Sequence, residues 1–160
     1  MLFELSGCDD KAVAEMQNEL KNSGAFCVSD DMEKKITELF WGGCCSDAQT
    51  LETIGNTYKE YGYLCDTHTA VAFHVAAQKK REGVPMVVLS TASPFKFPRS
   101  VLTALGQSAP ENDFEAMQQL EAATAHTAPA SLAALRQKPE RFSTVIEPAQ
   151  IAEVALGYQE

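Results

Sequence analysis

A row of small and hydroxyl-bearing residues, Ser90-Thr91-Ala92-Ser93, directly follows an apolar run from Met86 to Leu89. The run does not alternate with polar residues, which favours a parallel strand covered on both faces. Ligands of open α/β sheets bind just beyond the carboxyl ends of the strands, so Ser90 and Thr91 could donate hydrogen bonds to a small polar ligand. The alternative is a strand-to-helix turn in which a serine only caps the helix.

A second group of polar residues, His68 and Thr69, stands at the predicted start of a helix. Backbone N–H groups at a helix start suit an anion such as a phosphate, and the alternative is a plain helix cap beside a partly exposed His68. Lys96 lies between Phe95 and Phe97. It is either a cation for a phosphate or carboxylate, or a surface lysine whose stem is buried.

Two stretches of the chain carry a family resemblance: Tyr63 to Val71 (YLCDTHTAV) and Leu89 to Phe97 (LSTASPFKF). Together they resemble the carboxyl-terminal part of threonine synthase, in the group of these enzymes found in enterobacteria and fungi. The order and the separation of the two stretches also match. Many members carry proline where Thr67 stands and histidine where Ser93 stands, so the departures are local.

The resemblance implies an enzyme that uses pyridoxal phosphate to convert O-phospho-L-homoserine and water to L-threonine and phosphate. By motif position, Thr91 would hold the ring nitrogen of the cofactor, and Ser90 would line the same turn. His68, Thr69 and Lys96 are the candidates for binding the substrate.

The family's Schiff-base lysine and glycine-rich phosphate loop have no counterpart in this chain, so no catalytic residue is assigned. We therefore expect a carboxyl-terminal fragment that is inactive alone and lacks bound cofactor. Two alternatives are a catalytically silent homologue of threonine synthase and a flavodoxin-like α/β module that binds a phosphate ligand. A lysine motif and glycine-rich loop encoded upstream of Met1 would decide in favour of the enzyme.

Composition narrows the possible partners. The net charge of -9 argues against unaided binding to nucleic acid or an anionic membrane, and no apolar run is long enough to span a bilayer. The five cysteines are an odd number without a CxxC pair, which predicts reduced, buried thiols in a cytoplasmic protein and no metal site. Apolar surface left by a missing part of the enzyme predicts association, with a homodimer as the expected form.

The elements alternate between helix and strand, which predicts one α/β domain over residues 1–160. The fold class expected is a parallel sheet flanked by helices, and the resemblance places it in the tryptophan-synthase-β-like fold of pyridoxal-phosphate enzymes. Helical spacing and cap residues predict helices near residues 10–22, 30–39, 48–60, 68–82, 98–106, 113–123, 131–137 and from 148 onward. Strands are predicted at 25–28, 85–89 and 144–146, a short strand or a turn at 40–45, and a helical region at about 107–138.

Overall fold

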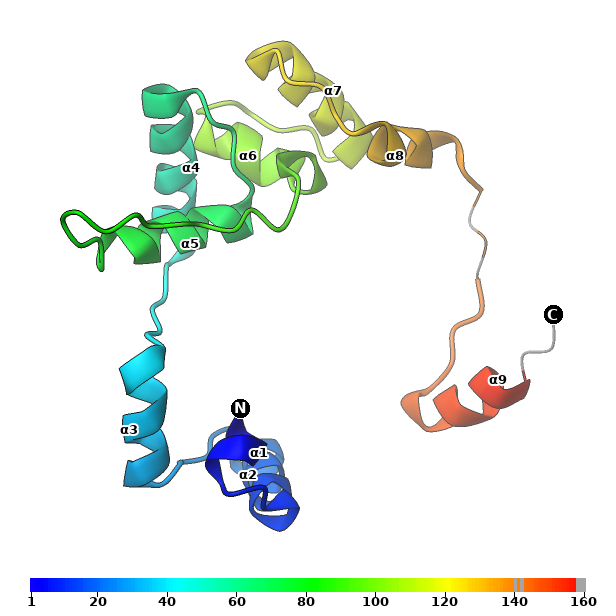
Figure 1. Ribbon diagram of the computed structural model, residues 1–160. Coiled ribbons are helices and arrows are strands. Elements are labelled where there is room, and N and C mark those ends of the chain that lie inside the picture. The colour runs from blue at the N-terminus through cyan, green and yellow to red at the C-terminus, as the bar shows by residue number, and fades with distance from the viewer. Residues whose placement is uncertain (140, 142, 158–160) are drawn as a thin grey trace. The chain divides into compact units, whose positions relative to one another are not determined.

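The computed structural model describes residues 1–139, 141 and 143–157 (Figure 1). The sequence predicts one domain, whereas the structure divides the chain into two compact units, Met1–Cys44 and Cys45–Glu160.

The first unit holds three helices: α1 (Leu2–Leu5), α2 (Asp10–Ser23) and α3 (Asp30–Leu39). Their ends follow from local chemistry. Asp9 accepts hydrogen bonds from two backbone N–H groups of the first turn of α2, and Gly24 ends that helix in the left-handed conformation. Ser29 caps α3 in the same way. The predicted helices in this unit are therefore confirmed, with boundaries set by the expected cap residues.

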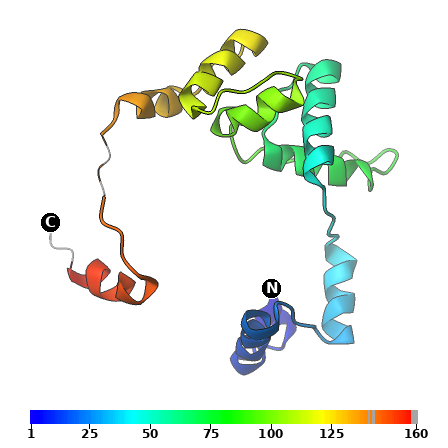
Figure 2. The same cartoon turned by 180° about the vertical axis from the view of Figure 1, so that it is seen from behind.

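The second unit is built on four helices that pack together: α4 (Asp47–Tyr61), α5 (Thr67–Ala77), α6 (Pro98–Ala104) and α7 (Asp113–Thr124). Figures 1 and 2 show α4 and α5 against one another, α6 beside α4, and α7 beside α6. The remaining elements are no longer than α6: η1 (Pro94–Lys96), α8 (Ala130–Ala133), η2 (Ala134–Gln137), η3 (Pro148–Gln150) and α9 (Ile151–Gly157).

One apolar core joins these four helices. Five of its members with no exposed surface come from α4, α6 and α7: Ile54, Val101, Leu102, Ala116 and Leu120. The core also includes Ala70 from α5, Cys65 from the residues just before α5, and Phe95 from η1. The core therefore holds the start of α5 and the η1–α6 corner in place, and these two segments carry most of the predicted site.

Helices α4 and α6 approach closely at Gly55. A Cβ atom added to Gly55 would lie 2.7 Å from the backbone oxygen of Ala104, which is too short for a carbon–oxygen contact. Glycine is therefore required at this crossing because no side chain fits between the two backbones.

The predicted parallel sheet is wrong. The described residues contain no strand, and the four predicted strand segments are all irregular: 25–28, 40–45, 85–89 and 144–146. A strand exists only where its backbone pairs with a neighbour, and among the described residues no backbone hydrogen bond joins two of these segments. A short apolar run in the sequence does not show whether a partner strand lies beside it, because that partner comes from residues distant in sequence. The flavodoxin-like alternative, which needs the same sheet, is wrong for the same reason.

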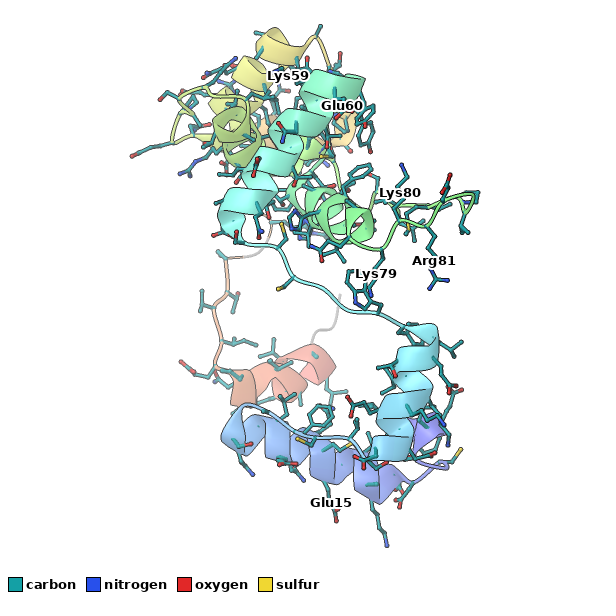
Figure 3. All side chains as sticks on the ribbon, turned by 90° about the vertical axis from the view of Figure 1, so that its left-hand side faces the viewer. Glu15, Lys59, Glu60, Lys79, Lys80 and Arg81 are labelled. Carbon is teal, nitrogen blue, oxygen red and sulfur yellow. The ribbon has the colours of Figure 1, made fainter. Side chains whose placement is uncertain are left out.

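The segment from Val84 to Leu89 is largely exposed, with Val88 partly buried. The side chain of Val87 is 77% exposed and that of Leu89 is 75% exposed. Helix α5 also ends at Ala77, earlier than the predicted 82, and Lys79, Lys80 and Arg81 project from the turn that follows it (Figure 3). Three consecutive basic residues favour such a solvated turn over further helix packing.

The cysteines are free thiols, but the prediction that they are buried holds for only one of them. Cys65 is buried, Cys45 is partly buried, and the other three are exposed: Cys8, Cys27 and Cys44. Burial raises the pKa of the Cys65 thiol to about 11, with the nearby Asp66 charge adding to the effect. Across residues 1–139, 141 and 143–157, no helix is both long and apolar enough to cross a bilayer.

Candidate functional site

Asp66 is the residue on which the start of α5 is built. Its side chain is 0% exposed, and one carboxylate oxygen accepts hydrogen bonds from the backbone N–H groups of His68 (2.8 Å) and Thr69 (3.4 Å). The other oxygen accepts a short hydrogen bond from the Thr69 hydroxyl. Between the two interpretations of this helix start, the structure therefore shows the cap, because these two N–H groups are already used by a carboxylate.

Among the described residues, no Lys or Arg side chain forms an ion pair with Asp66. Burial by itself would raise the pKa of Asp66, but the hydrogen bonds from Thr69 and His68 outweigh it and lower the pKa below its usual value. Asp66 is thus an ionised carboxylate at neutral pH, held by hydrogen bonds alone.

Thr69 connects this cap to the Ser90–Thr91 turn. The side chain of Thr69 is buried, and its Oγ1 lies 3.4 Å from Oγ of Ser90. Thr91 is exposed, and its hydroxyl forms no hydrogen bond within the described part of the chain. The structure therefore brings together Thr69 and Ser90, two residues that the sequence placed in different parts of the site, and leaves Thr91 available to a ligand.

His68 lies between Asp66 and Phe97. Its Nδ1 is 3.1 Å from a carboxylate oxygen of Asp66, and its ring lies 5.0 Å from the ring of Phe97, measured between centroids. The side chain is 62% exposed and lines a cavity of about 510 Å³ together with Val71 and Ser100. His68 is therefore oriented by a buried charge while its side chain lines a cavity.

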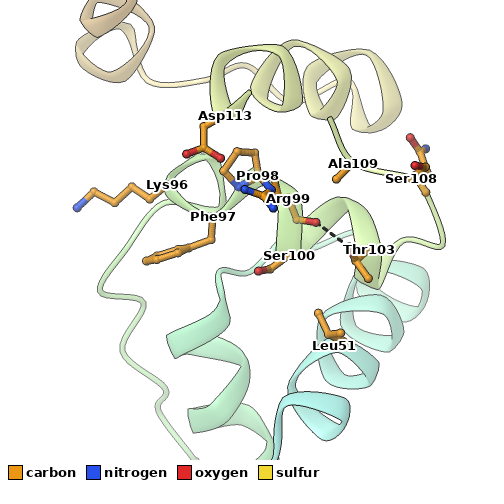
Figure 4. A pocket seen from close by; sticks show the side chains of 11 residues that line it. Leu51, Lys96, Phe97, Pro98, Arg99, Ser100, Thr103, Ser108, Ala109 and Asp113 are labelled. Carbon is orange, nitrogen blue, oxygen red and sulfur yellow. Dashed lines mark hydrogen bonds between the residues drawn. The ribbon is translucent and has the colours of Figure 1, made fainter. Parts of the chain in front are cut away.

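Lys96 lines a neighbouring cavity of about 720 Å³, shown in Figure 4. Arg99 and Asp113 line the same space, and neither Lys96 nor Arg99 forms an ion pair with a described residue. The two cavities share three lining residues, Leu51, Phe97 and Ser100. His68 and Lys96 thus stand on neighbouring cavities, with two cations in the larger one available for an anionic group.

Sequence reasoning missed three features of this site. Asp66 is no candidate site residue in the sequence analysis, whereas its carboxylate orients His68 and Thr69. Arg99 received no role, although its position three residues after Lys96 places both at the η1–α6 corner. The aromatic ring of Phe97 was taken only as cover for a lysine stem, whereas it packs against His68.

Comparison with known proteins gives a consistent result. A family model described as "Threonine synthase, C-terminal" matches residues 69–155. A threonine synthase from Pseudomonas aeruginosa is 43% identical over 110 residues, which are 68% of this chain and 24% of that protein. A threonine synthase from Methylobacillus glycogenes is 32% identical over 146 residues, 90% of this chain and 27% of that protein.

A solved structure shows the same likeness. The crystal structure of pyridoxal-phosphate-bound threonine synthase from Brucella melitensis superposes with a TM-score of 0.68 at 34% identity, covering 97% of this chain and 30% of that one. The chain therefore spans about a quarter to a third of the length of these relatives.

This chain, with its packed helices and its Asp66–Thr69–Ser90 cluster, is thus similar to the carboxyl-terminal part of a pyridoxal-phosphate enzyme. The chain belongs to the threonine synthase family, and its matched part is the family's carboxyl-terminal region.

Proposed function

We propose that this chain forms the carboxyl-terminal part of a cytoplasmic threonine synthase, which converts O-phospho-L-homoserine and water to L-threonine and phosphate. The observation that carries the proposal is the family match over residues 69–155, which begins at Thr69 and includes the Ser90–Thr91 turn. Because the chain spans only part of its relatives, the proposed activity belongs to an enzyme to which this chain contributes one portion.

Pyridoxal phosphate, when bound, supplies the electron sink that this reaction needs. The residues of the turn suit its ring nitrogen: Thr91 offers an exposed hydroxyl without a hydrogen-bond partner in the described chain, and Ser90 lies next to it. A neutral hydroxyl can hydrogen-bond the nitrogen without strongly favouring its protonation, unlike a carboxylate. We assign Thr91 to the ring nitrogen and Ser90 to the support of the turn.

The substrate carries a phosphate and a carboxylate, and the neighbouring cavities offer groups for both. Lys96 is an exposed cation that lines the larger cavity, and Arg99 and the carboxylate-bearing Asp113 line the same cavity. His68 faces the smaller cavity, where Asp66 orients its ring through Nδ1. We assign Lys96 and His68 to the substrate, whereas buried Thr69 contributes through its contact with Ser90.

Replacing Thr91 by valine tests this assignment, because the change keeps the shape and removes the hydroxyl. A lost hydrogen bond that leaves its partner unsatisfied costs about 1–3 kcal/mol, so phosphate release by the enzyme as its gene encodes it should slow roughly tenfold to a hundredfold. The absorbance maximum of the bound cofactor should also shift. Thr37→Val is the matched control, because Thr37 is exposed on α3 and its hydroxyl bonds only to carbonyls of its own helix.

Unchanged kinetics and an unchanged cofactor spectrum in Thr91→Val would remove Thr91 from the site. The 160-residue chain alone should release no phosphate from O-phosphohomoserine above a boiled control, because it carries no counterpart of the family's Schiff-base lysine. Sustained release by the pure chain would contradict the proposed division of the enzyme.

A further inference from the structure

Asp66 has an unusual environment for an ionised side chain. It is 0% exposed, and the described residues that hydrogen-bond to its carboxylate are only His68 and Thr69. A buried charge without a cation is costly unless hydrogen bonds satisfy it. A neutral Asn or Ser would cap the helix equally well, so capping alone does not require this charge.

The protons in this cluster can be assigned by counting. The Thr69 hydroxyl has a single proton, and the charged Asp66 oxygen, which forms the shorter contact, takes it. Thr69 Oγ1 then has only lone pairs to offer at its 3.4 Å contact with Ser90, so a hydrogen bond there needs the Ser90 hydroxyl as its donor. The charge on Asp66 thereby sets the direction of the Ser90 hydroxyl two hydrogen bonds away.

The contact matters because little else holds the turn. Within the described chain, residues 85–92 form one hydrogen bond to the rest of the protein, and it is the contact between Thr69 and Ser90. The preceding segment is largely exposed, with Val87 and Leu89 directed into solvent. This contact between Ser90 and the fully buried Thr69, called the tie below, therefore fixes the position of the turn.

We infer that Asp66 is a positioning residue, which acts through Thr69 to fix the Ser90 hydroxyl and hold the Ser90–Thr91 turn against the start of α5. The consequence for the cofactor rests on the proposed function, since Thr91 is the residue assigned to the ring nitrogen. The tie itself does not rest on it, because it is a feature of the protein without ligands.

Amide hydrogen exchange tests the tie on the protein as its gene encodes it, without added cofactor. Thr69→Val keeps the shape of the side chain and removes its hydroxyl. The change removes the contacts of that hydroxyl with Asp66 and with Ser90. Loss of the contact with Ser90, of ordinary strength, should speed exchange of the peptide spanning residues 86–93 roughly two- to tenfold, with α6 unchanged. Thr69→Ser retains the hydroxyl and should restore the slow exchange. Thr103→Val is the control, because that hydroxyl bonds only to Arg99 of its own helix.

Ser90→Ala supplies a second measurement, because an exposed serine can be replaced without harm to the core. It should speed exchange of the same peptide to the same extent, and Thr69→Val added to it should have no further effect. Unchanged exchange in Ser90→Ala, or Thr69→Ser behaving like Thr69→Val, would overturn the inference. Faster exchange of α4 and α6 in Thr69→Val would show a general loss of packing. Exchange of the peptide spanning residues 86–93 in Ser90→Ala would then decide whether the contact holds the turn.

Asp66→Asn separates positioning from capping. The amide still caps α5, but its NH₂ group can donate to Thr69 and so reverse the direction of both hydroxyl contacts. With pyridoxal phosphate bound, we expect a shifted absorbance maximum and wild-type helix content. An unchanged spectrum would refute the role of the charge. If neither the wild type nor any variant binds the cofactor, the proposed function fails. The contact between Thr69 and Ser90 is still supported in that case if the hydrogen-exchange results are as expected.

Discussion

Replacing Gly55 by alanine should destabilise the second unit, even though alanine is the better helix former. Gly55 lies inside α4, where it faces the backbone of α6. The new Cβ would lie 2.7 Å from the backbone oxygen of Ala104 and 3.7 Å from its carbonyl carbon. Both atoms belong to the end of a helix, so they cannot rotate away as a flexible side chain would.

Two opposing effects set the size of the change. Alanine gains about 1 kcal/mol over glycine in a helix interior. Overpacking of a close contact costs about 1–3 kcal/mol, and a contact this short against backbone belongs at the upper end of that range. The free energy of unfolding should therefore fall by about 1–2 kcal/mol.

Urea unfolding followed by circular dichroism at 222 nm measures the difference. Asn56→Ala is the matched control, because Asn56 is the exposed neighbour on the same helix. Its free energy of unfolding should rise by a few tenths of a kcal/mol, and by no more than about 0.5 kcal/mol, from helix propensity alone. A Gly55→Ala protein as stable as the wild type, with an unchanged dependence on urea, would refute the close approach of α4 and α6.

Three further outcomes follow from burial and charge. Leu102→Ala should lower the free energy of unfolding by about 2–5 kcal/mol in the same urea assay, because Leu102 is fully buried in the core; a loss below 1 kcal/mol would contradict that packing. Asp66 has a lowered pKa in the folded state, so its stabilising contribution is complete above the unfolded pKa of about 3.9 and is lost as the pH falls below that value. Between pH 5 and pH 2 the free energy of unfolding should therefore depend less on pH in Asp66→Asn than in the wild type. An equal dependence on pH in the two proteins would argue against the lowered pKa. Titration with a thiol reagent should modify exposed Cys8 at once and Cys65 only on unfolding, because burial raises the pKa of Cys65 to about 11; rapid reaction of Cys65 in the native protein would contradict its burial.

The sequence by itself determined the helices, because the signals that begin and end a helix are local. Asp9, Ser29 and Ser46 each bond to backbone N–H groups two or three residues further on, so their effect can be read from neighbouring positions. Gly24 and Gly62 end α2 and α4 in the left-handed conformation. The family resemblance was equally local, because it rested on two short stretches.

Only the tertiary structure decided the pairing of distant segments. The run from Met86 to Leu89 has the composition of a buried strand, yet it is exposed and unpaired in the described chain, because pairing requires a neighbour that composition does not reveal. The site shows the same division. Its polar residues were visible in the sequence, but the contact between Thr69 and Ser90, 21 positions apart, arises only when the core fixes α5 and brings the later segment beside it.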